Sequence, residues 1–111
     1  GGSGAADILV AARSGTVTRL DARTGTPRWS QSLGADARAE LVVVDGVVLV
    51  ADERERLTAL DAATGAVLWR VEPGLVVELA AAGESGGLVV AMVESGEIVA
   101  LERNSGEERW R

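Results

Sequence analysis

Apolar residues along the chain form short runs separated by turn-forming residues, a pattern that is typical of β-strands rather than helices. The run at residues 7–12 ends at the turn signal Arg13-Ser14-Gly15. Asp45-Gly46 joins two longer apolar runs, and Asp-Gly in that position is a strong hairpin signal. The pattern predicts eleven antiparallel strands, over residues 7–12, 16–21, 26–29, 38–44, 47–51, 56–61, 66–72, 76–82, 88–93, 97–101 and 107–111.

The hydrophobic pattern also changes from the inner to the outer strand of each group. Residues 47–51 and 88–93 are almost continuously apolar, which predicts strands covered on both faces. Residues 66–72 alternate, so that Trp69 shares one face with two valines while charged residues occupy the other. The equivalent strand of the first group contains Pro27, which belongs at a sheet edge because proline donates no ladder hydrogen bond. Four-stranded sheets of this kind, stacked radially, make a β-propeller, so the predicted fold class is all-β with four-stranded antiparallel blades.

An eleven-residue segment, Ala59 to Trp69, recurs at Arg19 to Trp29 and at Ala100 to Trp110. A repeat of about 40 residues indicates an array of small supersecondary units. We interpret each copy as a turn, held by an acidic side chain and a glycine, that positions a tryptophan between neighbouring sheets. Sugar stacking by the indoles is the less favoured alternative. The residues assigned to this structural docking motif are Asp21, Thr24, Gly25 and Trp29; Asp61, Thr64, Gly65 and Trp69; and Glu102, Ser105, Gly106 and Trp110.

The strand groups divide the chain into a start segment and three blades. Residues 1–6 are interpreted as a flexible linker or a cloning remnant, 7–35 as a blade without its first strand, 36–74 as the second blade and 75–111 as the third. Three blades do not close a ring, and an open arc exposes two apolar faces. We therefore expect a homo-oligomer completed head to tail, with a dimer of six blades favoured over a trimer of nine.

Composition removes several functional classes. The 111 residues include no cysteine and no histidine, which excludes disulfides, thiolate chemistry, cysteine metal sites and the usual general base. A net charge of −6 argues against nucleic-acid binding. No apolar run reaches the ~18 residues of a membrane span, so no membrane insertion is expected. The sequence therefore assigns no catalytic, cofactor-binding or metal residue, and no cofactor.

Two further clusters contain several charged residues. Residues 52–56 alternate in charge at a hairpin tip, which predicts a solvated turn, with a divalent-cation site as the minor alternative. Glu84 and Glu94 lie on predicted loops and show no convergent spacing. Gly15 and Gly96 align with Glu55, so the loop of the middle copy is expected to differ locally.

The repeated pattern Ala-x-Asp-x-x-Thr-Gly-x-x-x-Trp resembles the tryptophan-docking motif of quinoprotein-type β-propellers. This family includes dehydrogenases dependent on pyrroloquinoline quinone and the propeller lipoprotein of the bacterial outer-membrane assembly machine. The resemblance covers nearly all of the chain after residue 6, with departures at Arg19, Glu102 and Ser105. It implies that each tryptophan packs between blades while the acidic residue and the threonine hold the turn, and it suggests an extracytoplasmic or periplasmic location.

The resemblance also implies what an enzyme of this family would need. The quinone enzymes hold their cofactor and a calcium ion in an eight-bladed ring, using long loops, an adjacent cysteine pair, a catalytic aspartate and a tryptophan platform. This chain lacks cysteine, and the turn already uses Asp21 and Asp61. The expected function is a non-catalytic scaffold that binds protein. The alternatives are an engineered or excised fragment that self-assembles without activity and, less favoured, a quinone-binding dehydrogenase fragment.

Overall fold

The computed structural model describes residues 7–81 and 87–111 as an array of β-strands with no helix. Each predicted strand overlaps an observed one, and the strand ends differ by at most three residues. Residues 1–6, Glu84 and the predicted strand end at residue 82 lie outside the described ranges. The strands are β1 (Asp7–Ala11), β2 (Thr16–Asp21), β3 (Pro27–Ser32), β4 (Ala37–Val44), β5 (Val47–Asp52), β6 (Leu57–Asp61), β7 (Val67–Val71), β8 (Val76–Ala81), β9 (Leu88–Val93), β10 (Ile98–Glu102) and β11 (Glu108–Trp110).

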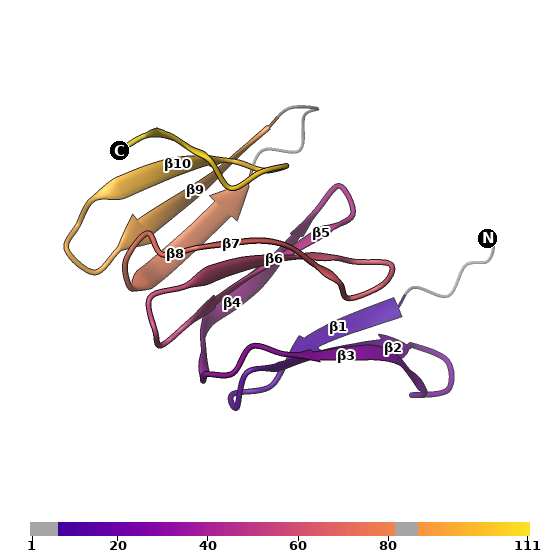
Figure 1. Cartoon of the computed structure of the whole chain (residues 1–111). Coiled ribbons are helices and arrows are strands. Elements are labelled where there is room, and N and C mark those ends of the chain that lie inside the picture. The colour runs from indigo at the N-terminus through magenta and orange to yellow at the C-terminus, as the bar shows by residue number, and fades with distance from the viewer. Residues whose placement is uncertain (1–6, 82–86) are drawn as a thin grey trace.

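The strands form three antiparallel sheets that lie side by side like the blades of a fan (Figure 1). Sheet 1 has the order β1-β2-β3, sheet 2 has β4-β5-β6-β7, and sheet 3 has β8-β9-β10-β11. Every pairing joins strands that are consecutive in sequence, so each sheet is a simple meander. Within the described ranges, no helical segment has the length and hydropathy needed to cross a membrane.

Two apolar clusters hold neighbouring sheets together. The first lies between sheets 1 and 2 and is centred on Val17, Val48 and Leu60. The second lies between sheets 2 and 3 and is larger. Its fully buried members include Leu49 and Leu57 of sheet 2. Because β5 contributes alternate residues to both clusters, sheet 2 is covered on both faces, as its continuous apolar run predicts.

A β-bulge recurs at the same place in all three sheets. In sheet 2 the register shifts between Ala59 and Leu60, which leaves Leu68 as the extra residue just before Trp69. The counterparts of Leu68 in sheets 1 and 3 are Arg28 and Arg109. A bulge rotates the side chain that follows it. This irregularity therefore helps to orient Trp29 and Trp69 toward the sheet that follows each of them.

The β5–β6 loop does not differ from its counterparts, so that expectation was wrong. Glu55 has a φ of 67°, in the same left-handed region as Gly15 at 96° and Gly96 at 97°. Its amide donates to the carbonyl of Asp52 at 3.3 Å, and the amide of Gly15 makes the equivalent bond to Ala12 at 2.9 Å. The middle loop keeps the shared backbone conformation with a residue that adopts it less readily.

The carboxylate of Asp52 explains how Glu55 is held in this loop. Asp52 is 1% exposed, and it accepts hydrogen bonds from the amides of Arg54 at 2.9 Å and Arg56 at 3.2 Å. The Arg56 guanidinium also donates to Asp52 at 2.9 Å and to the carbonyl of Leu33 at 2.8 Å. The prediction of a solvated turn is therefore wrong for Asp52. Its two oxygens already accept three donors, which disfavours the alternative of a cation site.

Replacing Glu55 with glycine should raise the free energy of unfolding by about 0.5–1 kcal/mol, because glycine adopts a positive φ without a Cβ penalty. Urea denaturation measures this change. Arg54→Gly is the matched control, since Arg54 lies in the same loop and is not among the positive-φ residues, and it should lower stability. A fall in midpoint for both variants would contradict the prediction.

Candidate functional site

The turn before each tryptophan has the same backbone hydrogen bonds in all three sheets. In sheet 2 the amide of Gly65 donates to the carbonyl of Asp61 at 2.7 Å, and the amide of Asp61 donates to Ala66 at 2.8 Å. Gly65 has a φ of 79°, which favours glycine. Sheets 1 and 3 repeat both bonds within 0.1 Å. The corresponding pairs are Gly25–Asp21 and Asp21–Thr26 in sheet 1, and Gly106–Glu102 and Glu102–Glu107 in sheet 3.

The hydroxyl and acidic side chains of the motif support this turn. Thr64 Oγ1 accepts the amide of Ala66 at 3.2 Å, and Thr24 does the same for the amide of Thr26. Ser105 Oγ replaces threonine in sheet 3, accepting the amide of Glu107 at 3.2 Å. The carboxylates of Asp21 and Asp61 each accept the amide two residues ahead, at 2.8 Å. Glu102 instead pairs with Arg109 across the turn.

The ring of Trp69 packs directly on the turn of sheet 3. A Cβ at Gly106 would lie 2.6 Å from the nearest ring atom, so only glycine leaves room for the indole. The indole Nε1 donates to the carbonyl of Arg103 at 2.6 Å, and Trp69 is 8% exposed. We call this arrangement, a tryptophan on the turn glycine of the next sheet with its nitrogen on a turn carbonyl, a docking joint.

Trp29 forms the equivalent joint with sheet 2. A Cβ at Gly65 would lie 2.6 Å from its ring, and Nε1 donates to the carbonyl of Ala62 at 3.0 Å. Gln31 adds a hydrogen bond to the carbonyl of Gly65 at 2.9 Å. Arg19, which stands where the other copies have alanine, also donates to Ala62. The departure at position 19 therefore reinforces the joint.

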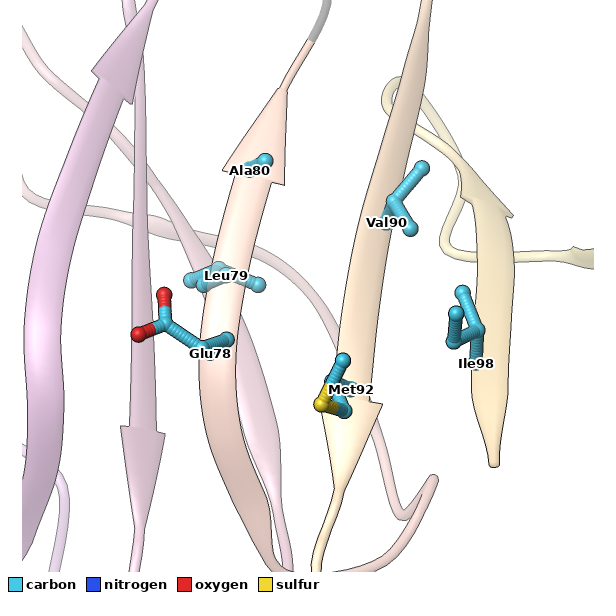
Figure 2. A pocket seen from close by; sticks show the side chains of 6 residues that line it. All are labelled: Glu78, Leu79, Ala80, Val90, Met92 and Ile98. Atoms are coloured by element: carbon cyan, nitrogen blue, oxygen red, sulfur yellow. The ribbon is translucent and has the colours of Figure 1, made fainter. Parts of the chain in front are cut away.

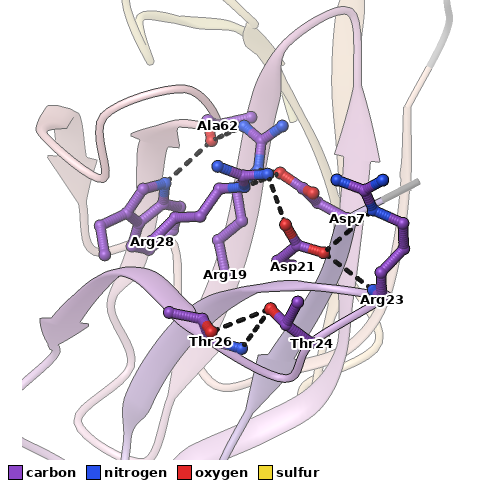
Figure 3. A network of polar contacts seen from close by, with 9 residues as sticks. Asp7, Arg19, Asp21, Arg23, Thr24, Thr26, Arg28 and Ala62 are labelled. Carbon is purple, nitrogen blue, oxygen red and sulfur yellow. Dashed lines mark hydrogen bonds and ion pairs between the residues drawn. The ribbon is translucent and has the colours of Figure 1, made fainter. Parts of the chain in front are cut away.

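Arg19 belongs to a polar network on sheet 1 (Figure 3). The Asp7 carboxylate accepts Arg19 Nε at 2.6 Å and pairs with Arg28 Nε at 2.8 Å, while Arg28 also donates to Asp21 at 3.0 Å. Desolvation raises the pKa of Asp7, but the hydrogen bonds and charges of Arg19 and Arg28 outweigh it and hold that pKa below its usual 3.8. The network therefore fixes the side chain of Arg19, which donates to the carbonyl of Ala62.

Sheet 1 has a turn glycine on which no described tryptophan packs, and sheet 3 has a tryptophan that packs on no described turn. Trp110 is 51% exposed, in contrast to Trp69. Gly25 has a φ of 75°, like the other turn glycines, but none of the described residues places an atom within 4 Å of the position of a Cβ there. Within the described part of the chain, two of the three motif tryptophans are therefore docked, and two of the three turns hold a ring. Sheet 3 offers the free ring and sheet 1 the free turn.

Apolar side chains surround both the free ring and the free turn. Leu9 and Ala11 of β1 pack toward sheet 2, so the alternate residues Ile8 and Val10 point away from the fan and are 49% and 43% exposed. We call the surface made by Ile8, Val10 and Gly25 the trailing face of sheet 1. The leading face of sheet 3 carries a hollow of about 180 Å³ (Figure 2), which is lined by Glu78, Leu79, Ala80, Val90, Met92 and Ile98.

Sequence reasoning missed the residues that accept the indole hydrogen bonds. Ala62 and Arg103 both use their backbone carbonyl, so the side chain at that position carries no signal. Arg103 has a second role, because its buried guanidinium donates to Asp45 of sheet 2 at 3.2 Å. The acceptor position has one sequence signal, which is its place one residue after the acidic residue of each copy. The residues at this position are Ala22, Ala62 and Arg103.

The residues present do not fit a quinone and calcium site. The chain has no cysteine pair, Trp29 and Trp69 are docked between sheets, and the carboxylates of Asp21 and Asp61 accept turn amides. Across residues 7–81 and 87–111, no three acidic, histidine or cysteine residues form a group that could hold a metal ion.

Comparisons with known proteins agree with this geometry. A quinoprotein ethanol dehydrogenase of Pseudomonas aeruginosa is 33% identical over 98 residues, which cover 78% of this chain and 16% of that protein. The outer membrane protein assembly factor BamB of Nitrosomonas eutropha is 32% identical over 87 residues, covering 77% and 21%. The crystal structure of BamB from Moraxella catarrhalis has a TM-score of 0.79 at 26% identity, covering 96% of this chain and 34% of that one.

This chain spans between 16% and 21% of the length of the two relatives compared by sequence. The structural match confirms that the three sheets are part of a β-propeller, and the relatives confirm the resemblance to quinoprotein-type repeats. A family model described as outer membrane protein assembly factor BamB matches residues 2–111. The chain therefore belongs to the BamB family of β-propeller repeat proteins.

Proposed function

We propose that the chain is a non-catalytic β-propeller module that serves as a scaffold for protein binding. The observation that carries this proposal is the docking joint, which occurs at both boundaries between sheets. It uses the indoles, hydroxyls and aspartates of the repeated motif for structure. The carboxylate of Asp61 and the hydroxyl of Thr64 are thus engaged in a turn, and the indoles of Trp29 and Trp69 hold one sheet against the next.

The exposed surfaces of the outer sheets support a role in protein contact. Ile8 and Val10 on sheet 1, and Met92 and Ile98 on sheet 3, are each at least 40% exposed. Clustered apolar side chains at a surface mark sites of protein contact. The assembly-factor name of the matching family supports the same role. Relatives also include a dehydrogenase, so the absence of catalysis has to be tested directly.

The purified chain should show no dye-linked alcohol dehydrogenase activity when pyrroloquinoline quinone and calcium are added, because the motif carboxylates of Asp21 and Asp61 are bound to turn amides. Dye reduction measured with a set of primary alcohols tests this expectation. Asp61→Asn is the matched variant, because it removes the carboxylate charge at nearly constant shape. Turnover by the parent chain that disappears in this variant would overturn the proposal and favour a dehydrogenase fragment.

A further inference from the structure

The two docking joints differ in one contact beside the turn glycine. At the joint between sheets 1 and 2, the side chain of Gln31 reaches sheet 2 and donates its amide to the carbonyl of Gly65 at 2.9 Å. Val71 stands at the same place in the next copy, 40 residues later. A valine side chain has no hydrogen-bond donor, so it cannot make this bond to the carbonyl of Gly106, the counterpart of Gly65.

A pocket lies at this place in the joint between sheets 2 and 3. Its volume is about 180 Å³, several times the ~30 Å³ that a water molecule occupies in the liquid. We call it the joint pocket. Sheets 2 and 3 both contribute to its lining, which consists of Val71, Glu72, Pro73, Leu101, Gly106 and Glu108.

The lining of the joint pocket combines apolar side chains with two carboxylates. Leu101 is 2% exposed and Pro73 is buried, so they form an apolar floor. Glu72 and Glu108 are exposed and supply negative charge at the rim. By its place in the repeat, the carbonyl of Gly106 is a further acceptor. An arginine side chain matches this combination, because it carries five N–H donors and a positive charge on an apolar stem.

The chain itself places a guanidinium against the joint pocket. Arg111 donates from Nη1 to the carbonyl of Pro73 at 3.4 Å and from Nη2 to the carboxylate of Glu108 at 3.2 Å. Both acceptors belong to residues that line the pocket. The rim of the pocket therefore already binds this chemical group.

The acidic rim is specific to one of the two joints. Glu72 and Glu108 correspond to Ser32 and Val67 at the joint between sheets 1 and 2, where Gln31 makes the bond to the turn carbonyl. Both joints hold a tryptophan on a turn glycine, so that structural role does not require the two glutamates. Their presence beside an open pocket points to a separate role in binding.

We infer that the joint pocket binds an arginine side chain from the protein partner of the proposed scaffold. The guanidinium donates to the carboxylates of Glu72 and Glu108 and to the carbonyl of Gly106. Its methylene stem packs on Val71 and Leu101. The net charge of −6 favours the approach of a basic segment. The inference rests on the proposed function and names the chemistry by which the partner is recognised.

The test is a nuclear magnetic resonance titration of the isotope-labelled 111-residue chain with a capped peptide, in which one arginine is flanked by glycine and serine. The amide signals of Gly106 and Glu108 should shift to saturation, with a dissociation constant in the millimolar range. A matched peptide with citrulline keeps the shape but removes the charge, and it should bind at least about tenfold more weakly. Methylguanidinium lacks most of the apolar stem and should also bind more weakly than the arginine peptide.

Val71→Gln is the main variant, because it introduces the residue that fills the other joint. Its side chain should occupy the joint pocket and weaken the binding of the arginine peptide at least about tenfold. Val71→Thr is the matched control, since threonine has nearly the volume of valine and leaves the pocket open, so the affinity should stay within about twofold.

Three further variants test the charges at the rim. Glu72→Gln and Glu108→Gln each remove one carboxylate at nearly constant shape and should weaken binding by about two- to fivefold. Arg111→Ala removes the guanidinium that competes for Glu108 and should therefore tighten binding. Weaker binding by Arg111→Ala would contradict the shared rim.

Equal affinities for the arginine and citrulline peptides would overturn the inference, as would an affinity that Val71→Gln leaves unchanged. Methylguanidinium that binds as tightly as the peptide would contradict recognition of a partner's side chain. The dispersion of the amide signals shows whether each variant is folded, and Glu72→Gln at an exposed position keeps the test decisive if Val71→Gln unfolds the chain. Failure to bind arginine without dehydrogenase activity contradicts only the pocket, whereas quinone-dependent turnover contradicts the proposed function.

Discussion

Trp69→Ala should lower the free energy of unfolding by about 3–5 kcal/mol, the usual range for removing a large buried aromatic side chain. Trp69 is 8% exposed and packs between sheets 2 and 3. The substitution also removes the hydrogen bond from Nε1 to Arg103, made at 2.6 Å, and leaves that buried carbonyl without its indole donor. Chemical denaturation followed by circular dichroism measures the loss.

Trp110→Ala is the control for this prediction, because it removes the same side chain from the same motif position where the ring is 51% exposed. It should therefore cost much less than Trp69→Ala. Equal and small shifts in the denaturation midpoint for both variants would contradict the structural role of the docked ring.

Gly106→Ala should destabilise the chain by about 2–4 kcal/mol, which combines the cost of a positive φ with that of a steric overlap. Gly106 has a φ of 76°, and a Cβ there would lie 2.6 Å from the ring of Trp69. Gly46, in the β4–β5 hairpin, has a φ of 78°, and no indole ring packs on it. Gly46→Ala therefore imposes the cost of a positive φ alone and should destabilise the chain by only about 1 kcal/mol. The same denaturation experiment compares the two.

A double-mutant cycle that combines Trp69→Ala with Gly106→Ala isolates the contact between the indole ring and position 106. Once the ring of Trp69 is gone, the Cβ at position 106 has room, so the double variant should cost at least about 1 kcal/mol less than the sum of the single variants. Additive losses would show that Gly106 is required for its backbone conformation alone. The cycle therefore tests whether glycine is there to admit the indole.

Much of the fold could be predicted because its determinants are local. Apolar runs, alternation and turn residues such as Asp45-Gly46 act over a few neighbouring positions, and they located all eleven strands. The repeat of the motif predicted that the tryptophans stand in equivalent places. Asp45 with a φ of 49° and Gly46 with a φ of 78° form the hairpin turn that the dipeptide indicates.

The features that could not be predicted depend on tertiary packing, which a local sequence pattern does not specify. The sequence suggested a different loop at Glu55, but the buried carboxylate of Asp52 holds the shared conformation there. Nothing in the pattern indicates that Trp29 and Trp69 pack on the following sheet rather than the preceding one. The indole acceptors, Ala62 and Arg103, were missed because they act through backbone atoms. The self-association stays a prediction.

The repetition of one docking joint has a consequence for how such chains change length in evolution. A ring and a turn that can receive one lie within each repeat of about 40 residues, and the rings of Trp29 and Trp69 pack on the turn of the following repeat. Duplicating that segment therefore supplies a new sheet together with two surfaces that already complement its neighbours. Gene duplication can add sheets to such an array without a new interface having to arise by point mutation.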